Sequence, residues 1–355
     1  MINVLKIHHL RNISSACLDL GPHFNFIHGI NGSGKTTLLE ALYMLSCGRS
    51  FRTRETAPLI QEGATQLTLF AQGEHGFQVS IQKNSHGQTL IKQDNRPCSS
   101  TSALAYALPT SIFYADIFEI IDAGAAIRRS VLDWGLFHVK HEYLSLIKTY
   151  KRVLKQRNML LKHERSYSQF YPWDLQLEDL AEKLHQLRLE YYEHWQQEFT
   201  TTLSQLTHLQ CSLQYFKGWD KKKQNIPLQR ALQEHFESDL KKQYTQLGAH
   251  QADLIIEHAS HKAKQYFSRG QQKIILMALK LSQTRFLEKP CLFLLDDFSA
   301  ELDNTHQNHL IKYLQNIRGQ FIITSTIPHN EIKYPIDNAL ASQHFIAHEG
   351  QIRPV

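Results

Sequence analysis

The sequence predicts an α/β fold that is assembled from both ends of the chain, with a mostly helical second lobe inserted between them. Near the N-terminus short strands lead into a glycine-rich loop, and apolar strands return near the C-terminus. From about Ile127 the intervening residues show the three- and four-residue spacing of amphipathic helices. We therefore expect residues 1–125 and 246–355 to form one lobe, and residues 126–245 to form a helical arm lobe.

The composition is that of a globular protein. Of its 355 residues, 42% are hydrophobic and 20% are charged, and no apolar run approaches the roughly 20 residues that a transmembrane helix needs. The five cysteines form no CxxC pair, which argues against a zinc site and for reduced thiols. We therefore expect a cytoplasmic protein with no membrane partner. The formal net charge of +6 slightly favours a polyanionic partner such as nucleic acid.

The local patterns predict individual elements. Strands are expected at residues 3–7, 15–20, 24–28, 66–70, 77–81, 89–92, 291–295 and 321–324. Helices are expected at residues 38–45, 141–165, 173–209, 227–244 and around 274–279. The second long helix carries a heptad-like apolar stripe made of Leu177, Leu180, Leu184, Leu187 and Tyr191. Two antiparallel helices that pack on each other would explain the two long patterns.

Residues 29–36 match the phosphate-loop pattern G-x-x-x-x-G-K-[ST] in full. In such a loop, backbone N–H groups at a helix N-terminus surround the phosphates of a nucleotide. Lys35 is expected to reach the β- and γ-phosphates of ATP, and the Thr36 hydroxyl to ligate Mg²⁺. A glycine-rich turn without a ligand is the alternative, which the strand–loop–helix context disfavours. The residues expected to bind ATP are Gly29, Ile30, Asn31, Gly32, Ser33, Gly34, Lys35, Thr36 and Thr37.

Two carboxylates follow the apolar strand at residues 291–295. Asp296 is suited to bind Mg²⁺ through a water molecule or to lie in the second coordination sphere of the ion. Asp297 is suited to orient or deprotonate the water that attacks ATP. Two carboxylates at the end of a buried strand are unfavourable unless a cation or hydrogen-bond donors compensate them. Two helix-capping aspartates are the structural alternative.

A third motif precedes the apolar helix at residues 274–279. Residues 267–271 resemble the LSGGQ signature of ABC ATPases, and residues 299–303 resemble the D-loop of the same proteins. By itself the S-x-G-Q-Q stretch is explained equally well as a helix cap. Its order with the other motifs favours the head of an ABC-type ATPase. The signature residues, expected to act in trans, are Ser268, Arg269, Gly270 and Gln271, and the D-loop residues are Ser299 and Asp303.

The spacing of these motifs narrows the resemblance to one family. About 230 residues separate Thr36 from Ser268, more than a transporter ATPase needs and far fewer than the coiled-coil arms of SMC or Rad50 proteins. This combination resembles the RecF family, bacterial recombination mediators with a Rad50-like head. Further stretches that resemble the family lie at residues 39–43, 48–53, 128–138 and 150–158, and departures from its pattern lie at 114–117 and 248–253. No Q-loop glutamine can be placed, and no switch histidine follows the strand at 321–324.

The resemblance implies a weak, DNA-dependent ATPase that dimerises on binding ATP, with hydrolysis acting as a switch. Lys35 and Asp297 would be catalytic, Thr36 and Asp296 would act on Mg²⁺, and Ser268 would come from the second protomer. It also implies binding to double-stranded and gapped DNA and to junctions, recombinase loading with the RecO and RecR proteins, and support of the SOS response. The alternative is the ATPase subunit of a membrane transporter. The missing switch histidine and the long insertion argue against that alternative.

Two basic segments are candidates for DNA contacts. One follows the first helix, and the other lies between residues 148 and 165, where seven basic residues accompany one acidic residue. In both segments ordinary solvated side chains are an alternative of comparable weight. The DNA-binding candidates are Arg49, Arg52, Arg54, Lys148, Lys151, Arg152 and Lys155.

Overall fold

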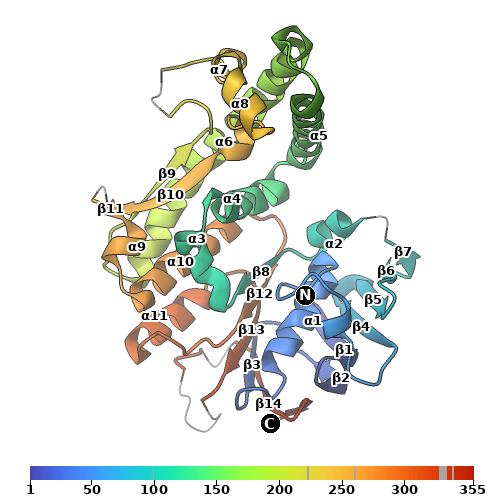
Figure 1. Ribbon diagram of the computed structural model, residues 1–355. Helices are drawn as coiled ribbons and strands as arrows, with labels where there is room; N and C mark the ends of the chain where they lie inside the picture. Colours follow the sequence, from blue (N-terminus) through green and yellow to red (C-terminus); the bar gives the residue numbers. More distant parts are fainter. Residues whose placement is uncertain (99, 222–223, 260, 328–333, 338–339) are drawn as a thin grey trace. The chain divides into compact units, whose positions relative to one another are not determined.

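The computed structural model describes residues 1–98, 100–221, 224–259, 261–327, 334–337 and 340–355 (Figure 1). The chain divides into two compact units, residues 1–117 with 287–355 and residues 118–286. These bounds differ from the expected ones, because residues 118–125 and 246–286 are grouped with the helical unit. In the described part of the chain, no helix combines the length and the apolar character needed to cross a membrane.

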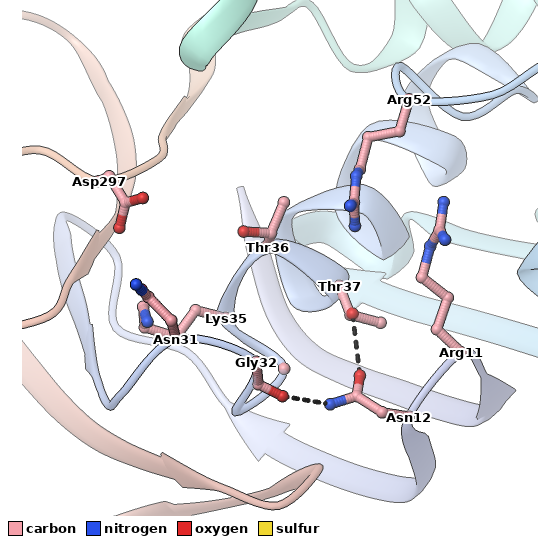
Figure 2. Close-up of a pocket in the computed structure, with 10 residues that line it drawn as sticks. Arg11, Asn12, Asn31, Gly32, Lys35, Thr36, Thr37, Arg52 and Asp297 are labelled. Atoms are coloured by element: carbon pink, nitrogen blue, oxygen red, sulfur yellow. Dashed lines mark hydrogen bonds between the residues drawn. The ribbon is translucent and has the colours of Figure 1, made fainter.

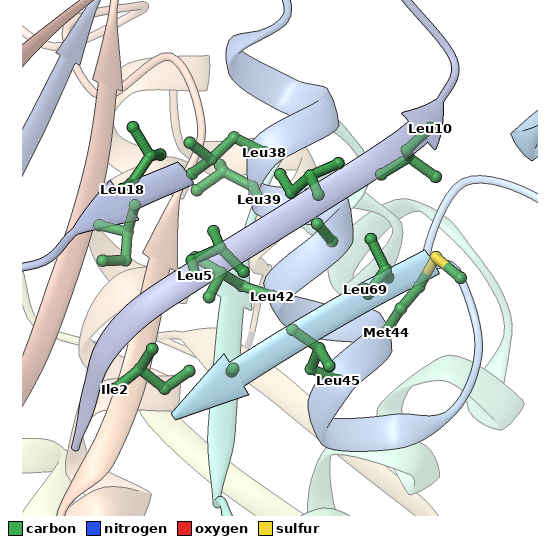
Figure 3. Packing of buried hydrophobic residues seen from close by; sticks show 14 of the residues in the cluster. Ile2, Leu5, Leu10, Leu18, Leu38, Leu39, Leu42, Met44, Leu45 and Leu69 are labelled. Atoms are coloured by element: carbon green, nitrogen blue, oxygen red, sulfur yellow. The ribbon is translucent and has the colours of Figure 1, made fainter. Parts of the chain in front are cut away.

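The first unit contains an antiparallel sheet of six strands in the order β2-β1-β4-β5-β6-β7. One face of β1 and β4 is apolar, and it packs against α1 (Lys35–Cys47), as Figure 3 shows for Leu5, Leu69 and the leucines of the helix. The expected N-terminal strands are confirmed, with longer bounds. The strands are β1 Ile2–Leu10, β2 Ile13–Asp19, β4 Gln66–Gly73, β5 Gln78–Asn84, β6 Thr89–Gln93 and β7 Arg96–Pro97.

A second six-stranded sheet, in the order β15-β14-β3-β13-β12-β8, forms the rest of this unit. Strands β14, β3, β13, β12 and β8 are parallel, and β15 is antiparallel to β14. Because the carboxyl ends of parallel strands meet at one edge, the loop after β3 and the acidic pair after β12 lie together there. The strands are β3 Phe24–His28, β8 Thr110–Phe113, β12 Cys291–Leu295, β13 Gly319–Ser325, β14 Ser342–His348 and β15 Gln351–Pro354. The remaining helices of the unit are α2 Thr101–Ala107 and α11 Asn304–Leu314.

Helices dominate the second unit. The two expected long helices are confirmed as α5 and α6, which pack along each other. The expected third helix at residues 227–244 is instead two short helices, α7 and α8, that meet at His235. The helices are α3 Glu119–Asp122, α4 Ala125–Val139, α5 Tyr143–His163, α6 Tyr171–Leu206, α7 Leu228–Glu234, α8 Phe236–Lys242, α9 Ala263–Tyr266 and α10 Arg269–Gln283. Short 3₁₀ turns in the chain lie at Ala57–Leu59, Glu74–Gly76, Ala115–Phe118, Tyr167–Gln169, Ala249–Gln251 and Thr284–Phe286.

Contacts with α6 explain why residues 246–286 belong to the helical unit. Trp195 of α6 donates to the carbonyl oxygen of Leu279 at 3.2 Å and to the hydroxyl of Ser282 at 2.9 Å, both on α10. An unexpected three-stranded antiparallel sheet, β11-β10-β9, adds further contacts. Its strands are β9 Ser212–Phe216, β10 Asp253–His258 and β11 His261–Lys262.

The buried stripe of α6 differs from the expected one at a single position. Arg188 is buried in place of the half-buried Leu187. The guanidinium of Arg188 donates to the carbonyl oxygen of Ala249 at 2.7 Å and to the carboxylate of Asp133 at 3.0 Å. A buried guanidinium is tolerated when its donors are paired, which a hydrophobicity pattern does not reveal.

Candidate functional site

The loop between β3 and α1 has the backbone of an anion-binding turn. Gly32 and Gly34 have φ angles of 80° and 109°, which residues with a Cβ atom rarely adopt. A Cβ atom on Gly29 would overlap the carbonyl oxygen of Ala347. Within the described part of the chain, no side chain caps α1 at Gly34, so the first N–H groups of the helix can bind an anion. The buried hydroxyl of Ser33 has no hydrogen-bond partner among the described residues, so it is available to bond to a ligand of the loop.

Lys35 begins α1 and is 5% exposed. Its ammonium group donates to the carbonyl oxygens of Gly29 at 2.7 Å and Ile30 at 2.9 Å. Burial lowers the pKa of Lys35, and the carboxylates of Asp297 and Asp296 oppose that shift. Among the residues that the structure describes, the Lys35 ammonium group therefore has carbonyl partners and no carboxylate within ion-pair distance, which leaves its charge available to phosphate.

Thr36 and Asp296 are in contact although they lie 260 positions apart in the sequence. The Thr36 hydroxyl donates to the two carboxylate oxygens at 3.1 and 3.0 Å, and the hydroxyl of Thr324 on β13 donates at 2.7 Å. Burial raises the pKa of Asp296, the two hydroxyl donors oppose the shift, and the charge of Asp297 adds to it.

Hydroxyl and carboxylate oxygens are ligands that Mg²⁺ prefers, so Thr36 and Asp296 fit that ion. Among the described residues, no group of three or more His, Cys, Asp or Glu side chains is placed to hold a metal ion. Mg²⁺ at this point would therefore also need oxygens from water and from phosphate, as is usual for this ion in nucleotide sites.

Asp297 has an uncommon backbone conformation. Its φ of 43° lies in the left-handed region, which residues with a side chain rarely adopt. Its N–H donates to the Thr324 hydroxyl at 2.9 Å, so one hydroxyl bonds to both acidic residues. Figure 2 shows the Asp297 carboxylate on the side of a pocket opposite Arg11 and Arg52. This pocket of about 350 Å³ is lined by Arg11, Asn12, Asn31, Gly32, Gly34, Lys35, Thr36, Thr37, Arg52 and Asp297.

Two residues that follow β1, Arg11 and Asn12, were not expected at this site. Asn12 donates to the carbonyl oxygen of Gly32 at 2.9 Å and accepts from the Thr37 hydroxyl at 3.0 Å (Figure 2). Arg11 forms a bidentate ion pair with the buried carboxylate of Glu40 on α1, at 2.5 and 2.9 Å. A lone carboxylate among apolar helix residues was the signal that could have revealed this pair.

The basic candidates differ in their surroundings. Arg49, Arg52 and Arg54 are exposed, and of these Arg52 lines the pocket. The basic candidates on α5 are also exposed, and their spacing of three and four residues places them on one face; they are Lys148, Lys151, Arg152 and Lys155. Arg157, in the same basic run, is fully buried and pairs with Asp174 and Asp239. Its position corrects the expectation of a uniformly solvated or DNA-facing run.

The signature residues form the N-terminus of α10. The Ser268 hydroxyl accepts from the N–H of Gln271 at 3.4 Å, and the Gln271 side chain accepts from the N–H of Ser268 at 3.0 Å. Arg269 donates to Asp122 at 2.7 Å and lies 4.8 Å from the ring centre of Phe118. The helix-cap interpretation of Ser268 is therefore confirmed, and the cap fixes the first turn of α10, which contains Gly270.

The expected D-loop lies between β12 and α11. Asp303 caps α11, because one of its oxygens accepts from the N–H of His306 at 2.8 Å and the other lies 2.8 Å from His306 Nδ1. The Ser299 hydroxyl lies 3.4 Å from the hydroxyl of Ser325, at the end of β13. Within one chain, then, Asp303 is a helix cap, whereas Ser299 lies beside the end of a central strand.

Comparisons with known proteins agree with this fold and identify the family of the chain. A family model described as the RecF/RecN/SMC N terminal domain matches residues 1–333. The DNA replication and repair protein RecF of Acinetobacter baylyi is 37% identical over 361 residues, covering 100% of this chain and 99% of that protein. The chain belongs to the RecF family. A second RecF relative, from Aliivibrio fischeri, is 36% identical and covers 90% of this chain and 91% of its own. Membership of the RecF family argues against the transporter alternative.

Solved structures support the same fold. The recombination mediator protein RecF with ATP, described in the RecFOR pathway, has a TM-score of 0.86 at 24% identity and covers 100% of this chain and 97% of its own. An Smc head bound to the C-winged helix domain of ScpA has a TM-score of 0.62 at 15% identity, covering 100% and 96%. The expected fold class, an ABC-type ATPase head with α/β architecture, is confirmed for this RecF family member.

Proposed function

We propose that the protein is an ATP-dependent DNA-binding protein of recombinational repair and replication restart, with ATP acting as a switch. The contact between Thr36 and Asp296, at 3.0 Å beside the uncapped N-terminus of α1, carries this proposal. Motifs from opposite ends of the chain thereby meet at a pocket with a cation, carboxylates and available helix N–H groups. A nucleoside triphosphate with Mg²⁺ matches that set of groups.

The residues of the pocket have different roles in ATP hydrolysis. Residues 29–37 bind the phosphates of ATP, and Lys35 neutralises part of their charge. Thr36 and Asp296 hold Mg²⁺, which when bound offsets charge on the phosphoryl oxygens. Asp297 orients or deprotonates the attacking water. Many ABC ATPases carry a glutamate at this place, and because aspartate is one methylene shorter, we expect slow hydrolysis that suits a DNA-dependent switch.

The signature acts in trans in this proposal. Each ATP is bound by Lys35 of one protomer and by the signature of the other, residues 268–271, with Ser299 and Asp303 of the D-loop at the same interface. The functional ATPase lobe then comprises residues 1–125 and 246–355, because it must include α10. An ATP-bound homodimer would present two sets of basic residues to one duplex, and each neutralised phosphate steepens the salt dependence of binding.

DNA is bound by exposed Arg49 and Arg54, which follow α1, and by the exposed basic face of α5, whereas Arg52 lines the pocket. Contacts to phosphates give little base preference. The names of the relatives, a DNA replication and repair protein and a recombination mediator of the RecFOR pathway, support a role in DNA repair. Gapped and double-stranded DNA and junctions are the targets in this proposal, as the family resemblance implies. The RecFOR name also supports RecO and RecR proteins as partners. Recombinase loading, support of the SOS response and a cytoplasmic location belong to the proposal through the family resemblance.

The experiment is a measurement of duplex DNA affinity across a salt titration, with and without a non-hydrolysable ATP analogue. We expect weak binding without the analogue, and tighter and more steeply salt-dependent binding with it. The matched variant Ser268→Arg should bind ATP, remain monomeric on gel filtration, and show no gain in DNA affinity with the analogue. Equal affinity and equal salt slope for the wild type in both conditions would rule out ATP control of DNA binding.

A further inference from the structure

A buried carboxylate on α1 links the pocket to the loop that follows the helix. Glu40 has no exposed surface. Arg11 donates to both of its oxygens, and the hydroxyl of Ser50 donates to one of them. The Arg11 pair by itself compensates the buried charge and satisfies both oxygens. The additional bond therefore has a different consequence, which is to attach Ser50 to the helix.

Ser50 in turn fixes the backbone of the loop. Its oxygen accepts from the N–H of Arg52 at 2.9 Å and from the N–H of Thr53 at 3.1 Å, which makes a tight polar turn. The ring of Phe51 lies 5.5 Å from that of Tyr43, edge-on, and 4.8 Å from that of Tyr114. The residues on both sides of Arg52 are thus anchored.

The guanidinium of Arg52 differs from that of Arg11. Arg11 is balanced by the charge of Glu40, whereas the side chain of Arg52 has no hydrogen bond or ion pair within the residues that the structure describes. Figure 2 shows both guanidinium groups on one side of the pocket, beyond Thr36. An unpaired guanidinium on an anchored backbone is well suited to bind phosphate oxygens, because little freedom is lost when it does.

We propose that Glu40 and Ser50 are positioning residues, which hold Arg52 where its guanidinium contacts the phosphates of bound ATP. The inference rests on the proposed function, because it requires that the pocket binds ATP. Ser50 does not line the pocket and acts only through the loop. Loss of its hydroxyl releases the N–H groups of Arg52 and Thr53 and lets the guanidinium move away from the pocket.

A double-mutant cycle on ATP affinity tests this arrangement in the full chain. Arg52→Ala should raise the Kd for ATP about tenfold, through loss of charge-assisted hydrogen bonds. Ser50→Ala should raise it about fivefold, and Ser50→Thr, which keeps the hydroxyl, should stay within about twofold of the wild type. In the Arg52→Ala background, Ser50→Ala should have no further effect, because its action passes through Arg52. Thermal unfolding midpoints close to that of the wild type would show that the variants fold.

The following results would overturn the inference. Independent effects, which multiply to about fiftyfold in the double variant, would mean that Ser50 acts without Arg52. If Arg52→Ala bound ATP as tightly as the wild type, the Arg52 guanidinium would not contact the phosphates of ATP. If Arg52→Ala changed only the affinity for duplex DNA, this guanidinium would be assigned to DNA binding. If the wild type binds no ATP, the proposed function and the inference both fail. If the wild type binds ATP and the cycle shows independent effects, the inference alone fails.

Discussion

Charged side chains are buried in two parts of the molecule, and their surroundings differ. In the helical unit, Arg157 is fully buried between the carboxylates of Asp174 and Asp239, at 2.6 and 2.8 Å. In the pocket at α1, Lys35 donates to loop carbonyls and Asp296 accepts from hydroxyls. Neither Lys35 nor Asp296 has an ion-pair partner within 4.0 Å in the described part of the chain.

This difference separates a structural cluster from a binding site. The cluster around Arg157 contains its own counter-ions, although one guanidinium nitrogen, Nη2, lacks a hydrogen bond among the described residues. Burial raises the pKa of Asp174 in the cluster and of Asp296 in the pocket, so a raised carboxylate pKa does not separate the two regions. In the pocket, Asp296 accepts from hydroxyl groups, and burial lowers the pKa of the cation Lys35. Burial of charge is therefore a poor marker of function by itself, and burial without a permanent counter-ion is a better one.

The largest effect on stability is expected at Arg157. Arg157→Leu leaves two buried carboxylates without a cation, so the free energy of unfolding should fall by about 3–5 kcal/mol. Lys155→Leu, on the exposed face of the same helix, should change it by no more than about 0.5 kcal/mol. Urea unfolding measures both. If the comparison is right, Arg157→Leu that remains folded at low temperature binds ATP like the wild type. A large loss of ATP affinity in folded protein would place Arg157 in the site.

Asp297→Asn should act on chemistry and not on stability. Without a base to orient or deprotonate water, kcat for ATP hydrolysis should fall about 100-fold or more, while ATP affinity stays within a few-fold of the wild type. The ATP-bound dimer should then dissociate more slowly. Single-turnover hydrolysis and gel filtration measure the two effects. Hydrolysis at the wild-type rate would exclude Asp297 as the general base.

Thr324 tests whether hydroxyl partners hold the acidic residues of the pocket in place, because its hydroxyl bonds to Asp296 and to the N–H of Asp297. Thr324→Val keeps the shape but removes the hydroxyl partner of that N–H and of Asp296, which frees both acidic residues to move. We expect kcat to fall about tenfold. Thr324→Ser keeps the hydroxyl and should hydrolyse ATP at nearly the wild-type rate. Equal losses in the two variants would show that packing, and not the hydroxyl, is what matters.

The smallest effect is expected from Asp296→Asn, measured as stability against pH. Burial raises the pKa of Asp296 above its ordinary value of 3.8, so ionisation of this carboxyl group is less favourable in the folded protein than in the unfolded chain. The stability that this group contributes is present below the unfolded pKa and is lost as the pH rises through the folded pKa. At pH 7, Asp296→Asn should therefore be more stable than the wild type, by about 1 kcal/mol, and the difference should vanish in acid. A less stable variant at pH 7 would mean that the ionised carboxylate is already well compensated.

Local motifs were enough to predict the centre of the pocket. The pattern of residues 29–36 by itself predicts a turn between a strand and a helix. The continuous apolar run of residues 291–295 predicts a strand, and Asp296 follows that strand. Thr36 and Asp296 were both expected to act on Mg²⁺ and therefore to share one site, but their direct hydrogen bond was not predicted. Their roles in ATP binding and hydrolysis remain predictions.

The surroundings of the pocket depend on contacts that no local pattern contains. Thr324 reaches Asp296 only because β13 lies between β3 and β12 in the sheet. Arg11 and Glu40 have opposite charges, but Arg11 lies in the turn after β1 and Glu40 lies on α1. No local sequence pattern indicates that these two residues are in contact. Arg188 can lie in the apolar stripe of α6 because residues distant in the sequence accept hydrogen bonds from its guanidinium group. For the same reason β9 and β10, which pair across 37 or more positions, were not expected.

The most direct test of the account is the affinity of labelled ATP for the wild type and for Lys35→Ala, measured by equilibrium dialysis with Mg²⁺. Removal of the buried cation that faces the phosphates should weaken binding by at least about 100-fold, to the point that none is detected at micromolar protein. Matching thermal unfolding midpoints would show that the variant folds. Unchanged affinity of Lys35→Ala for ATP would contradict the assignment of the pocket at α1 as the nucleotide site.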